Sequence, residues 1–216
     1  MLPAALIVAA YLIGSIPFSY LVVRMVAGAD IREHGSRNVG ATNVARNFGK
    51  FPGIFALLLD IAKGFAVIAL ARWMVARPDW PWADAAGSPL YSREFWIALA
   101  GLVAVLAHMY PVWLAFHGGK GVATAAGVFL ALDYRVMTAG MIVFLIVILL
   151  TRIVSLASIV SAASIPIFFR FLVDAPFWRV VMSMAIALAV IVKHHSNIAR
   201  LAQGRERRMG QKKDEP

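Results

Sequence analysis

Long apolar segments separated by shorter polar ones recur along the whole chain. The first, residues 2–23, carries no charged side chain and ends at Arg24. The remaining apolar segments are 51–72, 95–116, 121–132, 136–151, 153–173 and 177–193. Segments of this kind are typical of transmembrane helices. The pattern therefore predicts an all-α, polytopic integral membrane protein with seven transmembrane helices, the fourth of them short.

Composition supports the same class. The 216 residues are 61% hydrophobic and only 15% charged, with a mean hydropathy of +0.77, whereas a soluble domain of this length would expose more charge. Because no long polar segment is present, we expect one membrane-embedded domain over 1–216, with a basic tail from about residue 194. The first apolar segment lacks a preceding Lys or Arg, so it is expected to be a retained helix rather than a signal peptide. The sequence contains no cysteine, which excludes disulfides and thiol catalysis.

Basic residues predict how the chain is oriented. With the N-terminus outside and seven spans, 14 basic residues fall inside: Arg24, Arg32, Arg37, Arg46, Lys50, Lys120, Arg152, Lys193, Arg200, Arg205, Arg207, Arg208, Lys212 and Lys213. Six fall outside: Arg72, Arg77, Arg93, Arg135, Arg170 and Arg179. The positive-inside rule then favours a cytoplasmic C-terminus. Topology accounts for much of the net charge of +10, so nucleic acid is not an expected partner.

A glycine-rich turn interrupts the apolar pattern after Phe116. Gly118, Gly119 and Gly121 surround Lys120, and an apolar helical segment follows. Backbone N–H groups of such a turn, together with the start of the next helix, are suited to holding an anion, and Lys120 adds a positive charge. The alternative is a flexible turn with one topogenic lysine, because the spacing is not that of a Walker loop.

A second polar segment, residues 35–46, combines hydroxyl, amide and guanidinium groups without a carboxylate. Its candidate anion-binding residues are Ser36, Asn38, Gly40, Thr42, Asn43 and Arg46. Side chains of these types recognise phosphates and carboxylates. Taken singly, Ser36 could instead be a helix N-cap, and the two asparagines could be ordinary turn residues.

Two ionisable residues lie within an apolar segment. Asp60 and Lys63 are three positions apart, so they share a helix face and can pair in lipid. Ionisable residues inside a span more often mark function than structure, although a structural ion pair is the alternative. His108, shortly before Pro111, is expected only to bond a backbone carbonyl.

Two further polar groups lie near the predicted cytoplasmic face. Ser155 and Ser158 are small hydroxyl residues, for which close helix packing is the favoured interpretation. His194 and Asn197 share one face of a helix that Arg200 continues. Basic residues here could also be topogenic or contact lipid headgroups. The adjacent His194 and His195 lack nearby carboxylates, so no metal site is expected.

Taken together and in order, these motifs resemble the bacterial PlsY family of acyl-phosphate:glycerol-3-phosphate acyltransferases. The matching residues are Gly35, Ser36, Asn38, Gly40, Ala41, Thr42, Asn43, Arg46, Asp60, Lys63, Gly64, His108, Pro111, Phe116, Gly118–Thr124, Ser155, Leu156, Ser158, His194, Asn197, Ile198, Arg200 and Leu201. The resemblance implies seven helices, cytoplasmic motif loops and a place in the bacterial inner membrane. It also implies transfer of an acyl group from acyl phosphate to glycerol 3-phosphate, giving lysophosphatidic acid for phospholipid synthesis. Arg37, Ala107 and His117 depart from the usual family pattern, and the loop 73–94 is longer than expected.

The reaction needs two phosphate sites beside the bilayer. Gly118, Gly119, Lys120 and Gly121 are assigned to the acyl phosphate, whereas Ser36, Arg46, Lys63, His194 and Asn197 are assigned to glycerol 3-phosphate and its hydroxyl. Asn38, Gly40, Thr42, Asn43 and Ser155 are further candidates for substrate binding. The general base is either His194 or the substrate phosphate. We expect direct transfer, because no Ser–His–Asp or Cys–His arrangement is recognisable, and no cofactor.

Other classes of membrane protein, and other acyl donors, would require different sequence features. An organic-phosphate transporter would line a path through several spans with charge, and a membrane scaffold would not need both motif loops. The residues five positions after the histidines are Val39, Trp113, Val122, Ala199 and Arg200. None is acidic, unlike the His and Asp pair of acyltransferases that use thioesters. We therefore expect acyl phosphate as donor, a monomer, and membrane lipids as the surroundings.

Overall fold

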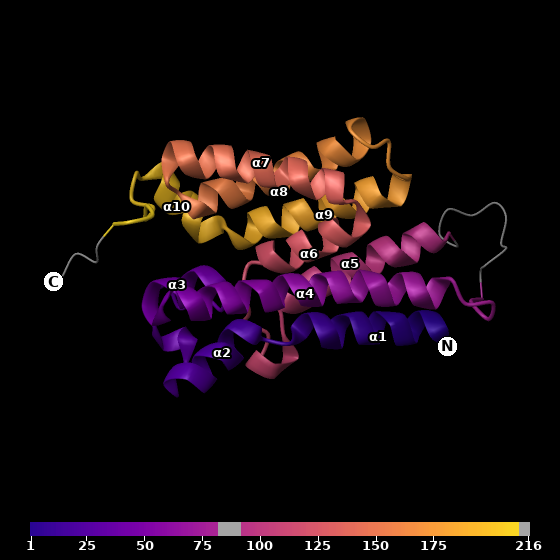
Figure 1. Cartoon of the computed structure of the whole chain (residues 1–216), viewed down its shortest axis with the longest axis horizontal. Coiled ribbons are helices and arrows are strands. Elements are labelled where there is room, and N and C mark those ends of the chain that lie inside the picture. The colour runs from indigo at the N-terminus through magenta and orange to yellow at the C-terminus, as the bar shows by residue number, and fades with distance from the viewer. Residues whose placement is uncertain (82–91, 212–216) are drawn as a thin grey trace.

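The computed structural model describes residues 1–81 and 92–211, and every regular element in these ranges is a helix. The helices are α1 (Leu2–Ser15), α2 (Phe18–Ala27), η1 (Ile31–Glu33), α3 (Ala41–Phe48), α4 (Lys50–Val75), α5 (Arg93–Met109), η3 (Val112–Leu114), α6 (Val122–Leu132), α7 (Tyr134–Thr151), α8 (Val154–Phe171), α9 (Phe177–Lys193) and α10 (His195–Ala202) (Figure 1). Parts of two predicted features, the loop 73–94 and the tail lysines Lys212 and Lys213, lie outside the described residues.

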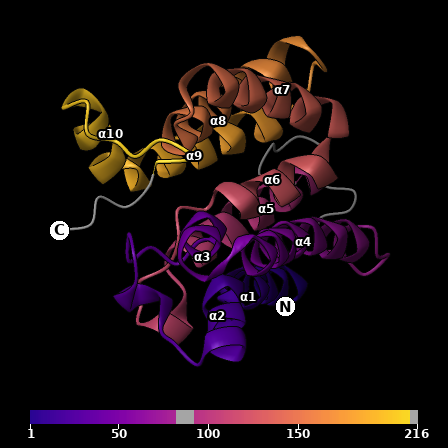
Figure 2. The same ribbon diagram turned by 60° about the vertical axis from the view of Figure 1, so that its left-hand side comes forward.

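The helices form three layers. Figure 2 shows α7, α8 and α9 on one side, α1 to α4 on the other, and α5 and α6 between them. The first apolar segment is not one straight helix, because Pro17 lacks the N–H that would continue the ladder and the chain breaks between α1 and α2. At this break the Ile16 carbonyl oxygen accepts a hydrogen bond from the Phe18 N–H at 3.1 Å, and its second lone pair can accept another from elsewhere in the bundle.

Several helices are long and apolar enough to cross a membrane. Within residues 1–81 and 92–211, five candidates qualify: Leu2–Ala27, Lys50–Val75, Arg93–Leu114, Tyr134–Thr151 and Val154–Phe171. The pair α9 and α10, bent by 59°, brings the number to six if it forms one span. Helix α6, predicted as the short fourth span, has 11 residues and is about 17 Å long, against about 30 Å of bilayer hydrocarbon. The prediction of a multi-pass helical protein is confirmed, while the count of seven spans stays a prediction.

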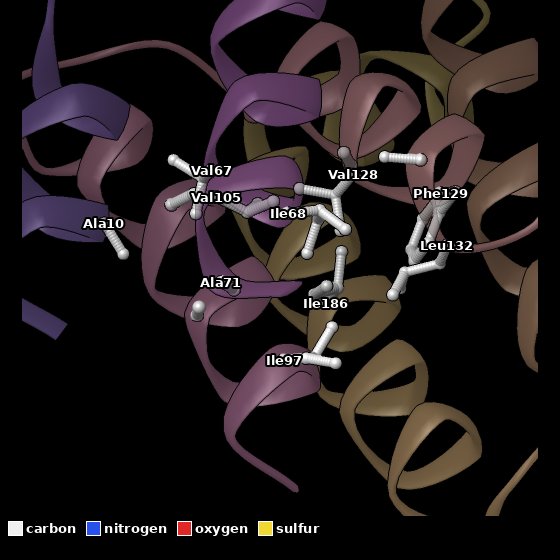
Figure 3. Packing of buried hydrophobic residues seen from close by; sticks show 14 of the residues in the cluster. Ala10, Val67, Ile68, Ala71, Ile97, Val105, Val128, Phe129, Leu132 and Ile186 are labelled. Carbon is white, nitrogen blue, oxygen red and sulfur yellow. The ribbon is translucent and has the colours of Figure 1, made fainter. Parts of the chain in front are cut away.

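The short helix α6 is held by a close crossing with α4. A Cβ atom at Gly64 would lie 2.1 Å from the carbonyl oxygen of Thr124, and one at Gly127 would lie 1.9 Å from that of Ile61. Only glycine at both positions lets the two backbones approach so closely. Beyond the crossing, apolar side chains fill the core, and Figure 3 shows Ile68 of α4, Val128 of α6 and Ile186 of α9 converging there.

The polar motifs gather at one end of the bundle. Helices α2, α3 and α10 are all at the end of the bundle opposite the beginning of α1 (Figure 1), with α10 on the side of α9 and with α2 and α3 on the side of α4 (Figure 2). The turn that leads into α6 faces the same end, because α6 begins there. Segments far apart in sequence therefore share one end of the bundle.

Candidate active site

Lys120 lies where three layers of the bundle meet. It comes just before α6, and Gly121, whose φ of 81° suits glycine, lets the chain turn into that helix. The half-buried Lys120 ammonium donates a hydrogen bond to Oδ1 of Asn197 in α10. The structure thus brings together two residues that the sequence assigned to the reaction.

A carboxylate from the tail completes this cluster. Glu206 Oε1 accepts hydrogen bonds from Asn197 Nδ2 at 2.5 Å and from Ser155 Oγ at 2.8 Å. Its Oε2 accepts from Arg200 Nε at 2.6 Å. We call Lys120, Asn197, Glu206, Ser155 and Arg200 the Lys120 cluster. Ser155 therefore makes a polar contact in addition to any part in helix packing, which was its favoured interpretation.

The charges of the cluster influence one another. Burial lowers the pKa of the Lys120 ammonium from 10.5 to about 8; Glu206 opposes this shift, whereas Arg200 and Arg46 add to it. Burial raises the pKa of Glu206, but hydrogen bonds from Asn197, Ser155 and Arg200 outweigh it and hold the pKa below 4.5. At neutral pH the cluster thus contains an ionised carboxylate and an ammonium ready to bind an anion.

Arg46 approaches the cluster from α3. Its exposed guanidinium has a lowered pKa, because neighbouring protein displaces part of its water and because Arg207 is close, while Glu206 opposes the shift. Positive charge from α3, α10 and the tail therefore surrounds Lys120. A cluster of this kind attracts substrates that carry several negative charges.

His194 lies at the bend between α9 and α10. It is 3% exposed, and its Nδ1 donates a hydrogen bond to the carbonyl oxygen of Val190 at 2.7 Å. Since a carbonyl only accepts, Nδ1 carries the proton in the neutral ring and Nε2 is the nitrogen with a free lone pair. This tautomer is the one that a general base acting through Nε2 requires.

The segment 35–46 is organised by one buried amide. Asn43 Nδ2 donates to the carbonyl oxygens of His34 at 3.0 Å and Asn38 at 3.1 Å, and its Oδ1 accepts from the Ser36 N–H at 3.1 Å. Asn43 thus fixes the conformation of residues 34–38, which is a structural role in addition to its predicted contact with substrate. Ser36 is not an N-cap, because α3 begins after Gly40 without a side-chain cap. The Ser36 and Thr42 side chains are exposed and Asn38 is half-buried.

In the glycine turn, two backbone N–H groups have partners other than the predicted anion. The N–H groups of Gly118 and Gly119 were expected to face an anion, but they donate to the carbonyl oxygens of Met109 and His108, both at 3.2 Å. These bonds tie the turn to the end of α5. Backbone donors at the start of α6 remain available for an anion, because no intrahelical carbonyl can reach them.

Lys63 lies in a second, buried cluster. Its ammonium is 2.8 Å from Asp60 Oδ1, and it donates to the Ile16 carbonyl at 2.7 Å and to His108 Nδ1 at 3.0 Å. The predicted ion pair is thus present. His108 bonds the lysine rather than only a backbone carbonyl, which corrects that expectation.

Comparison with known proteins identifies this arrangement. The profile of the glycerol-3-phosphate acyltransferase family matches residues 4–204, almost the whole chain. The chain belongs to this family. It is 42% identical to a glycerol-3-phosphate acyltransferase of Acaryochloris marina, covering 96% of this chain and 92% of the relative, and 43% identical to one of Thermosynechococcus vestitus, covering 93% and 92%.

Solved structures agree with the family match. One crystal structure is of PlsY, an integral membrane glycerol 3-phosphate acyltransferase, in its glycerol 3-phosphate form; the TM-score is 0.83 at 38% identity, over 96% of each chain. The lysophosphatidic acid form of PlsY gives a TM-score of 0.80 at 36% identity, over 96% of this chain and 95% of that one. The protein is therefore a multi-pass membrane glycerol-3-phosphate acyltransferase, as the resemblance of its motifs implied.

Three residues of this acyltransferase were not assigned to the site from sequence. Glu206 is the only acidic residue in the described basic stretch from Lys193 to Gln211, and that isolation was the available signal. Asp60 was recognised only as the partner of Lys63. The residues around His108 did not indicate its role, because its contact with Lys63 is between α5 and α4 and joins positions far apart in sequence.

Proposed function

We propose that this acyltransferase uses acyl phosphate as donor and glycerol 3-phosphate as acceptor, and releases lysophosphatidic acid and inorganic phosphate. The observation that carries this proposal is the Lys120 cluster. An amide, a hydroxyl and a guanidinium donate to one carboxylate at the end of an apolar bundle, the Lys120 ammonium donates to that amide, and Arg46 is close by. A phosphate can replace the carboxylate oxygens as acceptor for the same donors.

The transfer is a direct displacement. The glycerol hydroxyl oxygen attacks the acyl carbon, the bond from that carbon to the phosphate oxygen breaks, and phosphate leaves with the bonding electrons. The hydroxyl proton passes to His194 Nε2 or to a phosphate oxygen. Because acyl phosphate already has a good leaving group, the enzyme mainly aligns the substrates and stabilises negative charge.

Each side chain has a role in this scheme. Lys120 and the first N–H groups of α6 hold the phosphate of the donor, with the glycine turn setting their position. Arg46, with its planar guanidinium, grips the phosphate of the acceptor, and Ser36 assists it. Asn197 keeps Lys120 in place and orients the hydroxyl together with His194. No cofactor takes part.

An apolar groove near the turn supports a lipid donor. It has a volume of about 300 Å³. Its lining residues are Ile16, Pro17, Tyr20, Leu21, Trp113 and Leu114. Ile16 and Pro17 also border the buried cavity beside Gly118 and Gly119, so a chain lying in the groove has its head near the glycine turn.

We further propose seven spans in the bacterial inner membrane, with the N-terminus outside and the Lys120 cluster facing the cytoplasm. The distribution of basic residues favours this orientation. The chain forms one acyltransferase unit and acts as a monomer surrounded by membrane lipids. Because the sequence has no cysteine, single cysteines introduced at His117 and at Arg93 can be labelled from either side. Labelling of position 117 from outside would overturn both the orientation and the site.

The test of function is a donor comparison. Purified protein is given glycerol 3-phosphate with palmitoyl phosphate, palmitoyl-CoA or palmitoylated acyl carrier protein, and lysophosphatidic acid is measured. We expect product from palmitoyl phosphate and little or none from either thioester. Comparable rates from a thioester would refute the donor assignment, and transport of glycerol 3-phosphate without product would favour a transporter instead.

A further inference from the structure

A buried polar cluster lies deeper in the bundle and has no part in the chemistry proposed above. Asp60 and Lys63 of α4 are 1% and 3% exposed, and His108 of α5 is 7% exposed. Ser19 of α2 donates to Asp60 Oδ2 at 3.3 Å. Burying charged groups among apolar helices is unfavourable unless they are paired, so the cluster needs a reason to be there.

Lys63 is 3% exposed, and its ammonium is surrounded by groups of the protein. It donates hydrogen bonds to the Ile16 carbonyl oxygen and to His108 Nδ1, and it forms an ion pair with Asp60 Oδ1. The assignment of Lys63 to glycerol 3-phosphate stays a prediction, and these buried contacts suit Lys63 to a positioning role. Lys63 joins the break between α1 and α2 to the end of α5.

His108 carries this connection to the glycine turn. Since Lys63 donates to Nδ1, the proton of the neutral imidazole is on Nε2. Nε2 lies against Gly119, where an added Cβ would be only 2.2 Å away, and on the other side the same Cβ would meet the Val39 carbonyl oxygen at 2.5 Å. Gly119 thus lies between the imidazole and Val39 of the segment 35–46.

The space around this contact is small. A cavity of about 10 Å³, room for about one water molecule, is bordered by Lys63, His108, Gly118 and Gly119. The turn therefore cannot move toward the cluster without displacing the imidazole. The backbone bonds of Gly118 and Gly119 to the last turn of α5 restrict it further.

We propose that Asp60, Lys63 and His108 are positioning residues for acyl transfer. Asp60 fixes Lys63, Lys63 fixes the His108 ring, and the ring sets the place of Gly119 and hence of Lys120 and the start of α6. This inference rests on the proposed function, in which the turn sets the donors for the phosphate of the acyl donor. An error of about 1 Å in such an alignment lowers turnover about 100-fold.

The experiment removes both charges at once. Asp60→Leu with Lys63→Met leaves no unpaired charge, and such replacements often preserve folding. If the pair only stabilises the fold, the folded double variant retains normal kinetics. If the pair positions the turn, the variant has a higher KM for palmitoyl phosphate and a lower kcat, with kcat/KM reduced about 100-fold, while KM for glycerol 3-phosphate changes little.

A matched control uses another ion pair between helices. Glu94 and Arg179 link the first turns of α5 and α9 at 2.7 Å, whereas His108 is at the other end of α5. Glu94→Leu with Arg179→Met should leave both KM values unchanged. An equal rise of the palmitoyl phosphate KM in this control would overturn the proposal.

A second variant tests the proposal in case the double variant does not fold. His108→Asn keeps an oxygen that can accept from Lys63 but removes the ring edge beside Gly119. We expect it to fold and to show the same rise in KM for palmitoyl phosphate. Normal kinetics in either folded variant would overturn the proposal, as would failure of both to fold, which would make the cluster purely structural.

Binding without turnover separates this inference from the proposed function. Palmitoyl phosphate should raise the Tm of the wild-type protein and raise that of the double variant much less. A wild-type protein that is stabilised but makes no lysophosphatidic acid would refute the proposed function, while a smaller rise in the Tm of the double variant would still show that the cluster positions the glycine turn for binding palmitoyl phosphate. Equal stabilisation of both proteins would refute the inference alone.

Discussion

The protonation of Lys120 should limit activity on the alkaline side. Burial holds the pKa of its ammonium at about 8 instead of 10.5. If the charged form binds the phosphate of the donor, kcat/KM is highest below this value and falls as the pH rises through it. Near pH 9 about one tenth of the lysine is still charged, so kcat/KM should be about tenfold below its plateau.

The lowered pKa of Lys120 also affects the stability of the folded protein. A lysine with a pKa near 8 in the folded state and near 10.5 in the unfolded state binds its proton more weakly when folded. The charge therefore destabilises the folded protein at neutral pH, by at most about 3 kcal/mol, and this loss is recovered as the pH rises from about 8 to 10.5. Lys120→Met should accordingly abolish turnover and raise the Tm.

The assay measures lysophosphatidic acid formation from limiting palmitoyl phosphate between about pH 6 and pH 10, in the wild type and in Lys120→Arg. The guanidinium stays charged throughout this range, so the variant should be less active but should lack the alkaline decline. A wild-type profile that is flat through pH 9.5 would refute the reasoning. An unchanged decline in the arginine variant would do so as well, because the titrating group would then be another one.

Three other substitutions test separate parts of the structure. Arg46→Lys should lower kcat/KM about 100-fold with little change in Tm, because lysine cannot hold a phosphate at two points; near-normal steady-state kinetics would remove Arg46 from the site. Arg37→Gly should raise the free energy of unfolding by about 1 kcal/mol, since φ is 59° at this position, and an unchanged or lower Tm in a thermal melt would contradict that. Gly127→Val should lower the free energy of unfolding by about 3 kcal/mol, because the new side chain meets the Ile61 carbonyl oxygen. Its control, Ala126→Val on a half-exposed face of α6, should be tolerated. Equal thermal melts of the two variants would contradict the close crossing of α4 and α6.

Hydropathy predicted most of the helices with little error. The segment 177–193 coincides with α9, and 121–132 differs from α6 by one residue. It did not locate the break at Pro17, because apolar side chains continue on both sides of it, nor α3 inside a segment interpreted as a loop. Helix α3 is short and has a buried polar residue, Asn43, where the apolar pattern expects a hydrophobic one.

The sequence identified the motifs that form the site but not the contacts between them. Lys120 and Asn197 were both assigned to the reaction, yet nothing local connects residues 77 positions apart. The role of Glu206 depends on the tail folding back onto α8 and α10, a tertiary event without periodicity. Lys63 was recognised as unusual, but its partner Ile16 depends on the helix break that hydropathy did not indicate.

The central claim is direct acyl transfer from acyl phosphate to glycerol 3-phosphate, and phosphate release in a single turnover tests it most directly. Enzyme in excess is mixed with palmitoyl phosphate, and inorganic phosphate is followed before and after glycerol 3-phosphate is added. The account predicts no release before the addition and, after it, phosphate and lysophosphatidic acid in equal amounts. A burst of phosphate before glycerol 3-phosphate arrives, or phosphate without lysophosphatidic acid afterwards, would contradict it.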